Sequence, residues 1–113
     1  MSREVRLTEQ ARRDLHQAAL WWAENRSAEQ AERWYNGFAK AIRSLAQKYQ
    51  RCQLADENDD FPMEVRQLHY GLGRHATHRA VFTVRPGVVL VLRIRHLAQD
   101  ALSFDDALPE CNT

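Results

Sequence analysis

The chain has 113 residues, which is enough for one compact domain and too few for two. Hydrophobic residues make up 44% and charged residues 27%, a balance typical of a folded globular protein rather than a disordered one. The formal net charge is only +1, so bulk charge does not indicate nucleic-acid binding, and no apolar run approaches the ~20 residues of a membrane span.

The N-terminal sequence has no apolar run, so we expect no signal peptide and no membrane partner. The two cysteines, Cys52 and Cys111, form no CxxC motif and no metal-ligand spacing with the histidines. We therefore expect a cytoplasmic protein with no metal and no cofactor.

The first half of the chain predicts one strand and two helices. Polar and apolar residues alternate over residues 4–7, which indicates a short strand, and Thr8 is expected to cap a helix over about residues 9–25. Ser27 opens a second helix, with Gln30 at the third position of a capping box. Helices joined so tightly must fold back as an antiparallel hairpin. The apolar stripes are Ala11, Leu15, Ala18 and Trp22, then Ala31, Trp34, Phe38, Ala41 or Ile42, Leu45 and Tyr49.

The second half predicts a loop and three strands. Residues 50–61 contain four acids and no clear period, which indicates a loop. Strands are expected at about residues 63–70, 77–84 and 88–95, with a turn containing two glycines before the second and an Arg-Pro-Gly turn before the third. One short helix is expected within residues 97–108.

The resulting order, β-α-α-β-β-β, predicts an α+β fold in which the helical hairpin packs on a small, mostly antiparallel twisted sheet. We expect a single domain over residues 1–108, followed by a flexible C-terminal tail at residues 109–113.

Strand parity predicts a cationic sheet face. Counting alternate residues places Ala80, Phe82 and Val84, and Val88, Leu90, Leu92 and Ile94, against the helices. The opposite face then carries Arg79 and Val81 of one strand and Val89, Val91, Arg93 and Arg95 of the next, with Arg66 on a neighbouring strand. A half-apolar, half-cationic open face suits an anionic or protein ligand. The alternative interpretation is a set of solvated strand arginines.

Histidines and tryptophans are the other candidate functional residues. His96 ends the last strand, and His69, His75 and His78 fall in or near the turn before the third strand, so a pair of them could act as acid and base. The alternative is surface or structurally bonded histidines. Trp21, Trp22 and Trp34 are expected to pack within the hairpin, and the alternative interpretation is that they bind a partner protein.

The chain resembles the RelE/ParE toxin superfamily, of the plasmid-stabilisation type, over roughly residues 5–100. Arg66 and Arg79 match arginines of that family's middle strands, and His96 and Asp100 match its closing histidine and acid. The resemblance implies this fold, no cofactor, and the toxin role in a type II toxin–antitoxin pair. The segments that carry it are LTEQARRDLHQAALWW, AERWYNGFAKAIRSLAQ, VRQL, HRAVFTV and VLVLRIRHLAQD.

Departures from the family pattern bear on the target. The turn YGLGRHATH is longer than usual, Thr77 or His78 replaces a frequent aromatic, and Gln99 replaces a frequent arginine. No tyrosine follows Tyr70, and the few lysines all lie in the second helix, whereas the RNA-cleaving branch typically relies on such residues. The pattern is therefore nearer to the gyrase-poisoning ParE branch.

Three functions remain open at this point. The first is a toxin that inhibits growth by binding DNA gyrase. The second is a ribosome-dependent mRNA endoribonuclease, in which Arg66, Arg79, Arg93 and Arg95 supply positive charge and His96 or His78 is the acid or base. The candidate catalytic residues are Arg66, Arg79, Arg93 and His96. The third is a non-toxic binding module of the same fold. In each case we expect a cognate antitoxin to cover the open sheet face and the hairpin, at Arg79, Val81, Val89, Val91, Arg93, Arg95, Trp21 and Trp22, and a homodimer is expected when the protein is free.

Overall fold

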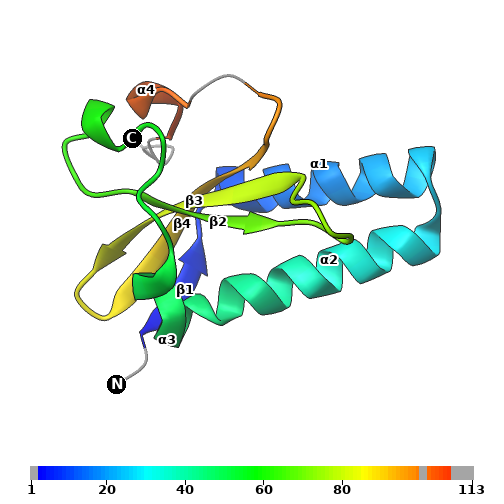
Figure 1. The fold of residues 1–113 in the computed structure, drawn as a ribbon, viewed down its shortest axis with the longest axis horizontal. Coiled ribbons are helices and arrows are strands. Elements are labelled where there is room, and N and C mark those ends of the chain that lie inside the picture. The colour runs from blue at the N-terminus through cyan, green and yellow to red at the C-terminus, as the bar shows by residue number, and fades with distance from the viewer. Residues whose placement is uncertain (1–2, 100–101, 108–113) are drawn as a thin grey trace.

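The computed structural model describes residues 3–99 and 102–107 and has the expected α+β architecture (Figure 1). The sheet has the strand order β1-β4-β3-β2, in which β1 runs parallel to β4 and the other pairs are antiparallel. The tail expected at residues 109–113 lies outside the described residues. The elements are β1 Glu4–Leu7, α1 Glu9–Asn25, α2 Ala28–Arg43, α3 Leu45–Lys48, the 3₁₀ turns η1 Tyr49–Arg51 and η2 Asn58–Asp60, β2 Arg66–Tyr70, β3 His78–Arg85, β4 Val88–His96 and α4 Phe104–Ala107.

Both expected N-caps of the helical hairpin are present. The Thr8 hydroxyl accepts from the Ala11 N–H at 3.0 Å, and the Ser27 hydroxyl accepts from the Gln30 N–H at 3.0 Å. The second helix is shorter than its apolar stripe suggested, because α2 ends at Arg43 and α3 continues the stripe as a separate turn. In the described part of the chain, no helix is long and apolar enough to cross a membrane.

The larger core lies between the hairpin and one face of the sheet. Trp34 and Phe38 of α2 are fully buried there, as is Phe82 of β3. The stripe expected along the second helix is confirmed, because its residues from Ala31 to Leu45 that face the sheet are at most 8% exposed. Burial of these large side chains is the main stabilising contribution of the hairpin.

A β-bulge in β4 sets which of its side chains face the helices. Val81 pairs with Arg93, but the next residue of β3, Phe82, pairs with Val91. Leu92 is therefore an extra residue opposite the Val81–Phe82 step, and the alternation of side chains is interrupted there.

The parity expected for the first half of β4 is consequently wrong. Leu90 and Leu92 were expected against the helices but pack on the opposite side of the sheet. Val89 and Val91, expected on the open face, are fully buried against the hairpin. Beyond the bulge the expectation holds, because Ile94 does face the helices. In β3 the residues that face the helices as expected are Ala80, Phe82 and Val84.

The second sheet face is not open, which corrects the sequence-based expectation of an exposed cationic surface. The loop between η1 and β2 and the segment with α4 lie over this face, on the side of the sheet away from the hairpin (Figure 1). Phe61 and Val65 of the loop and Leu102 of the C-terminal segment form a small core there with Val81 and Leu92. Two apolar sheet faces need two covering layers, and the chain supplies both.

Candidate functional site

Arg79 is buried in an ion pair on the second sheet face. Its side chain is 7% exposed, and both guanidinium Nη atoms donate to the carboxylate of Glu57, which is 1% exposed. Nη1 also donates to Gln67 Oε1 at 2.9 Å. The Leu102 N–H donates to Glu57 Oε2 at 2.6 Å, so this ion pair joins the loop, the strand and the C-terminal segment. Arg79 is thus neutralised and covered rather than presented to a ligand.

The Glu57 carboxyl remains ionised although it is buried. Burial raises its pKa, but the hydrogen bonds from Arg79, from the Leu102 N–H and from its own backbone, together with the Arg79 charge, outweigh this effect. The net pKa lies below the ordinary value, so the pair is charged at neutral pH.

Arg66 ties the long loop to the edge of β2. Its Nε donates to Glu64 Oε1 at 2.9 Å and its Nη1 donates to the Cys52 carbonyl at 2.6 Å. Burial raises the pKa of the Cys52 thiol although the Arg66 charge lowers it, so this cysteine is not a reactive thiolate at neutral pH.

Arg93 is held by Asp14 of α1 where the partner strand of β4 has ended. β1 stops opposite Val91, and the edge of β4 beyond it must find other hydrogen-bond partners. Asp14 provides one, because its Oδ2 accepts from the Ile94 N–H at 3.0 Å. The same carboxylate binds Arg93 through Nε at 2.7 Å and Nη2 at 3.1 Å. Thr8 completes the edge by donating its hydroxyl to the Leu92 carbonyl at 2.8 Å.

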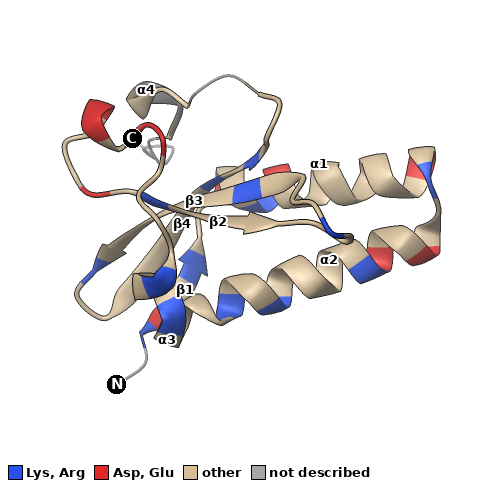
Figure 2. Ribbon diagram, in the orientation of Figure 1, with Lys and Arg blue, Asp and Glu red and all other residues tan. Residues whose placement is uncertain are grey.

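The four candidate catalytic residues therefore do not form one cluster. Arg66 and Arg79 bind acids of the loop side, and Arg93 binds a helix on the hairpin side. Arg95 is half-buried and lies opposite Arg79 in the β3–β4 register. Figure 2 shows the acidic residues around η2 gathered near α4, whereas the basic residues are spread over helices and strands. Val81, Val89 and Val91, expected to bind a partner, are fully buried.

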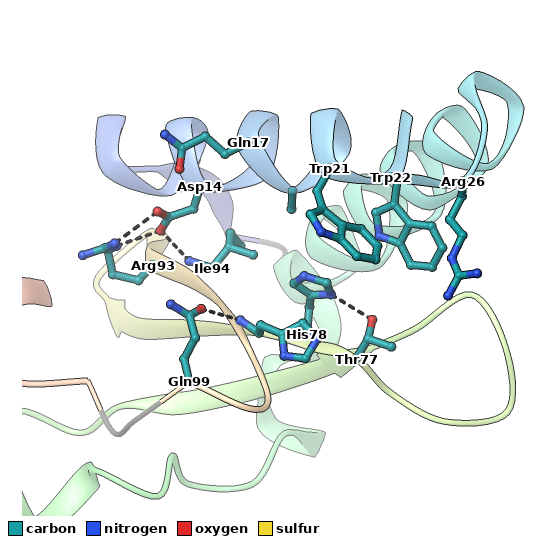
Figure 3. Close-up of a pocket in the computed structure, with 12 residues that line it drawn as sticks. Asp14, Gln17, Trp21, Trp22, Arg26, Thr77, His78, Arg93, Ile94 and Gln99 are labelled. Carbon is teal, nitrogen blue, oxygen red and sulfur yellow. Dashed lines mark hydrogen bonds and ion pairs between the residues drawn. The ribbon is translucent and has the colours of Figure 1, made fainter. Parts of the chain in front are cut away.

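A cavity of about 560 Å³ lies between α1 and the ends of β3 and β4 at which His78 and His96 lie (Figure 3). Trp21 and Trp22 of α1 form one wall, and His78 lies across from them. The Asp14–Arg93 pair lies toward one end of this pocket and Arg26 toward the other. Of the four candidate catalytic residues, Arg93 and His96 line it.

His78 is the buried histidine of this pocket. Its Nδ1 lies 2.8 Å from the Thr77 hydroxyl, and its ring contacts those of Trp34 and His96 with centroids 4.9 and 5.0 Å apart. Burial, and then the neighbouring charge of His96, lower its pKa to about 4. His78 is therefore neutral near pH 7, and such a weak base is poorly suited to proton abstraction there.

His96 is exposed at the end of β4. Its Nδ1 accepts from the Ala98 N–H at 3.0 Å, and its own N–H donates to Gln99 Oε1 at 2.7 Å. His69 and His75, the other histidines considered from the sequence, are exposed and do not line this pocket.

The tryptophans divide between core and surface. Trp34 is fully buried, as expected for hairpin packing. Trp21 is 51% exposed and meets Trp22 edge to face, with ring centroids 5.6 Å apart. The Nε1 atom of Trp22 is buried without a hydrogen-bond partner among the described residues. Packing accounts for Trp34, whereas about half of the Trp21 side chain remains accessible to solvent.

Sequence reasoning missed three residues of these sites. Glu57 carries no signal that separates it from the neighbouring loop acids. Asp14 does carry one, because it directly precedes Leu15 of the apolar stripe and so lies on the flank of the buried face. Arg26 directly follows the helix expected over residues 9–25, and its position in the sequence carries no signal of a pocket.

Comparisons with known proteins agree with this architecture. Residues 5–101 match a family model described as the ParE toxin of the type II toxin–antitoxin system parDE. No curated protein matches the chain. Among solved structures, a chromosomal ParDE system from P. aeruginosa aligns with a TM-score of 0.67 and 19% identity, over 84% of this chain and 96% of that one. The RelBE2 toxin–antitoxin complex from Mycobacterium tuberculosis aligns with a TM-score of 0.55 and 21% identity, over 88% and 95%.

Proposed function

The chain belongs to the ParE toxin family of type II toxin–antitoxin systems, and on that basis we propose that it inhibits growth by binding DNA gyrase and that a cognate antitoxin neutralises it. The antitoxin is supported by the solved relatives, which are described as toxin–antitoxin systems or complexes. The gyrase target is supported by the match to a ParE toxin model, and RNA cleavage is disfavoured because the candidate arginines are bound to carboxylates.

One observation carries the preference for binding over RNA cleavage: the candidate arginines are bound to carboxylates. Cleavage requires cations that can stabilise charge developing on a phosphate, close to a base that titrates near neutral pH. Arg79 is covered and paired with Glu57, and Arg93 is paired with Asp14. His78, with its pKa of about 4, does not supply that base.

The test measures both activities with the same purified protein. We expect it to inhibit supercoiling of relaxed plasmid by gyrase, and a translated message in a cell-free system to stay intact by primer extension. Inhibition that disappears when purified antitoxin is added first would support both parts of the proposal. Supercoiling that is unaffected at toxin concentrations well above that of gyrase contradicts the proposed target.

A second candidate function, a ribosome-dependent endoribonuclease, is favoured by one feature. His96 is exposed and lines the same pocket as Arg93. Codon-phased cuts that vanish in His96→Ala and weaken in Arg93→Ala would support this activity instead. If neither activity is found and expression does not slow growth, the chain is a non-toxic binding module.

A further inference from the structure

We infer that the pocket beside Trp21 binds an acidic segment of a partner protein, with an apolar side chain seated between Trp21 and His78 and a carboxylate at Arg26. This inference deepens the proposed function, because it names the surface with which a protein-binding toxin holds its target. Its principal test does not use gyrase.

The pocket has the size and walls of a side-chain receptor. Its volume of about 560 Å³ falls in the range of roughly 300–1,000 Å³ that is usual for ligand pockets. Indole rings of Trp21 and Trp22 lie along α1, and Ile94 and His78 lie across from them (Figure 3). An apolar side chain inserted here would exchange water for aromatic and aliphatic surface.

Trp21 marks the rim of this pocket as an interaction surface. Trp21 is 51% exposed, so about half of the side chain is not used by the fold, and among the described residues its ring contacts that of Trp22. Tryptophan is enriched among the residues that dominate binding energies at protein interfaces, because a large rigid ring buries much area at low entropy cost.

The polar groups of the pocket call for an acceptor. Trp22 Nε1 has no acceptor among the described residues, but it is buried, so the charge of Arg26 is the polar feature that an occupant can reach. Arg26 lines the pocket and, within residues 3–99 and 102–107, has no ion-pair partner.

The carboxylate found among the described residues of the pocket does not offset this charge. Asp14 is engaged by Arg93 and by the Ile94 N–H. The unmatched charge of the pocket is therefore positive and complements an acidic occupant.

A peptide fits these features better than a nucleic acid does. Binding of a phosphate backbone depends on several cations that each neutralise a phosphate. This pocket offers Arg26 as its unmatched cation, whereas the rest of its wall is mainly aromatic and aliphatic. Stacking of a base on Trp21 is the competing outcome that the experiment must detect.

The experiment selects random peptides on phage against the wild-type protein, with a Trp21→Ala/Arg26→Glu variant as the counter-target. We expect the enriched peptides to share an apolar residue close to Asp or Glu. Their synthetic forms should bind each single variant about tenfold or more weakly than wild type, as for interface hot spots. Both substituted side chains are exposed, so the variants should keep the native circular dichroism spectrum.

Two matched controls separate the pocket from general surface effects. Leu20→Ala removes an exposed apolar side chain next to Trp21 that does not line this pocket. Arg85→Glu reverses an exposed charge at the opposite end of the β3–β4 pair from His78 and His96. Both controls should bind the selected peptides as wild type does.

Three outcomes of the binding experiments overturn the inference: no enrichment, enrichment of peptides that bind the pocket variants equally well, or single-stranded oligonucleotides that bind in a manner dependent on Trp21. Its failure is distinguishable from failure of the proposed function. Gyrase inhibition that is equal in wild type and in Trp21→Ala keeps gyrase as the target but rejects this surface. Selected acidic peptides without gyrase inhibition keep the surface and reject gyrase.

Discussion

Glu57→Gln tests whether the buried ion pair holds the second core together. The substitution keeps the size of the side chain but leaves the Arg79 guanidinium buried without its counter-charge. Removing one partner of a buried pair costs about 3–5 kcal/mol, because the remaining charge is desolvated and uncompensated. A domain of this length has a total stability on the order of 10 kcal/mol, so the loss would be a third to a half of it.

The corresponding fall in melting temperature is about 13–21 °C, from an unfolding entropy of roughly 2.1 cal/mol/K per residue over 113 residues. Thermal and urea unfolding followed by circular dichroism measure both quantities. Glu4→Gln is the matched control, because its pair with Arg6 is exposed and its loss should leave the stability nearly unchanged. A Glu57→Gln variant within about 1 kcal/mol of wild type would refute the view that this ion pair stabilises the second core.

Three further predictions concern the hairpin side. Because the pKa of His78 is lowered to about 4 in the folded protein, the unfolded chain binds the proton at a higher pH, and the free energy of unfolding should fall by up to about 3 kcal/mol as the pH drops from 6.5 to 4. Urea unfolding should show a smaller loss of stability over this pH range in His78→Phe. Asp14→Ala should lower the free energy of unfolding by about 2 kcal/mol, and Asp14→Asn, which keeps an acceptor for the Ile94 N–H, by about 1 kcal/mol. Equal losses in urea unfolding would contradict the view that Asp14 stabilises the edge of β4 by accepting from Ile94. Gly37→Ala should lower the free energy of unfolding by about 1 kcal/mol, although alanine favours a helix, because the alanine Cβ would overlap Tyr70 Oη. Thermal unfolding should show a smaller loss of stability when the same substitution is made in Tyr70→Phe.

The element order could be predicted from the sequence because the local signals agree with the tertiary structure. Thr8 and Ser27 are capping residues placed just before apolar stripes of helical period, and each caps the helix that follows it. The Arg-Pro-Gly turn places a glycine at Gly87, where φ is +77°, a conformation that favours glycine. Capping and turn signals depend only on residues that are close in the sequence, so they can be recognised without knowledge of the tertiary structure.

The faces of β4 could not be predicted, because its sequence is compatible with two registers. Residues 88–92 are all apolar, so either parity puts hydrophobic side chains against the helices. The bulge at Leu92 selects one of them, and it depends on packing across the sheet rather than on a local motif. The pairing of Arg79 with Glu57, 22 residues away, was hidden for the same reason.

The bulge also determines which surfaces of this toxin-family chain remain for partners. With Val89 and Val91 turned to the hairpin, Leu90 and Leu92 make the other face apolar as well, and the loop and the C-terminal segment cover it. That cover brings Glu57 onto Arg79, so a ligand that binds this arginine must first displace a carboxylate from it. A partner that binds at the rim of the hairpin displaces only water. We therefore expect a partner to bind at the accessible aromatic pocket rather than on the arginine-bearing sheet face.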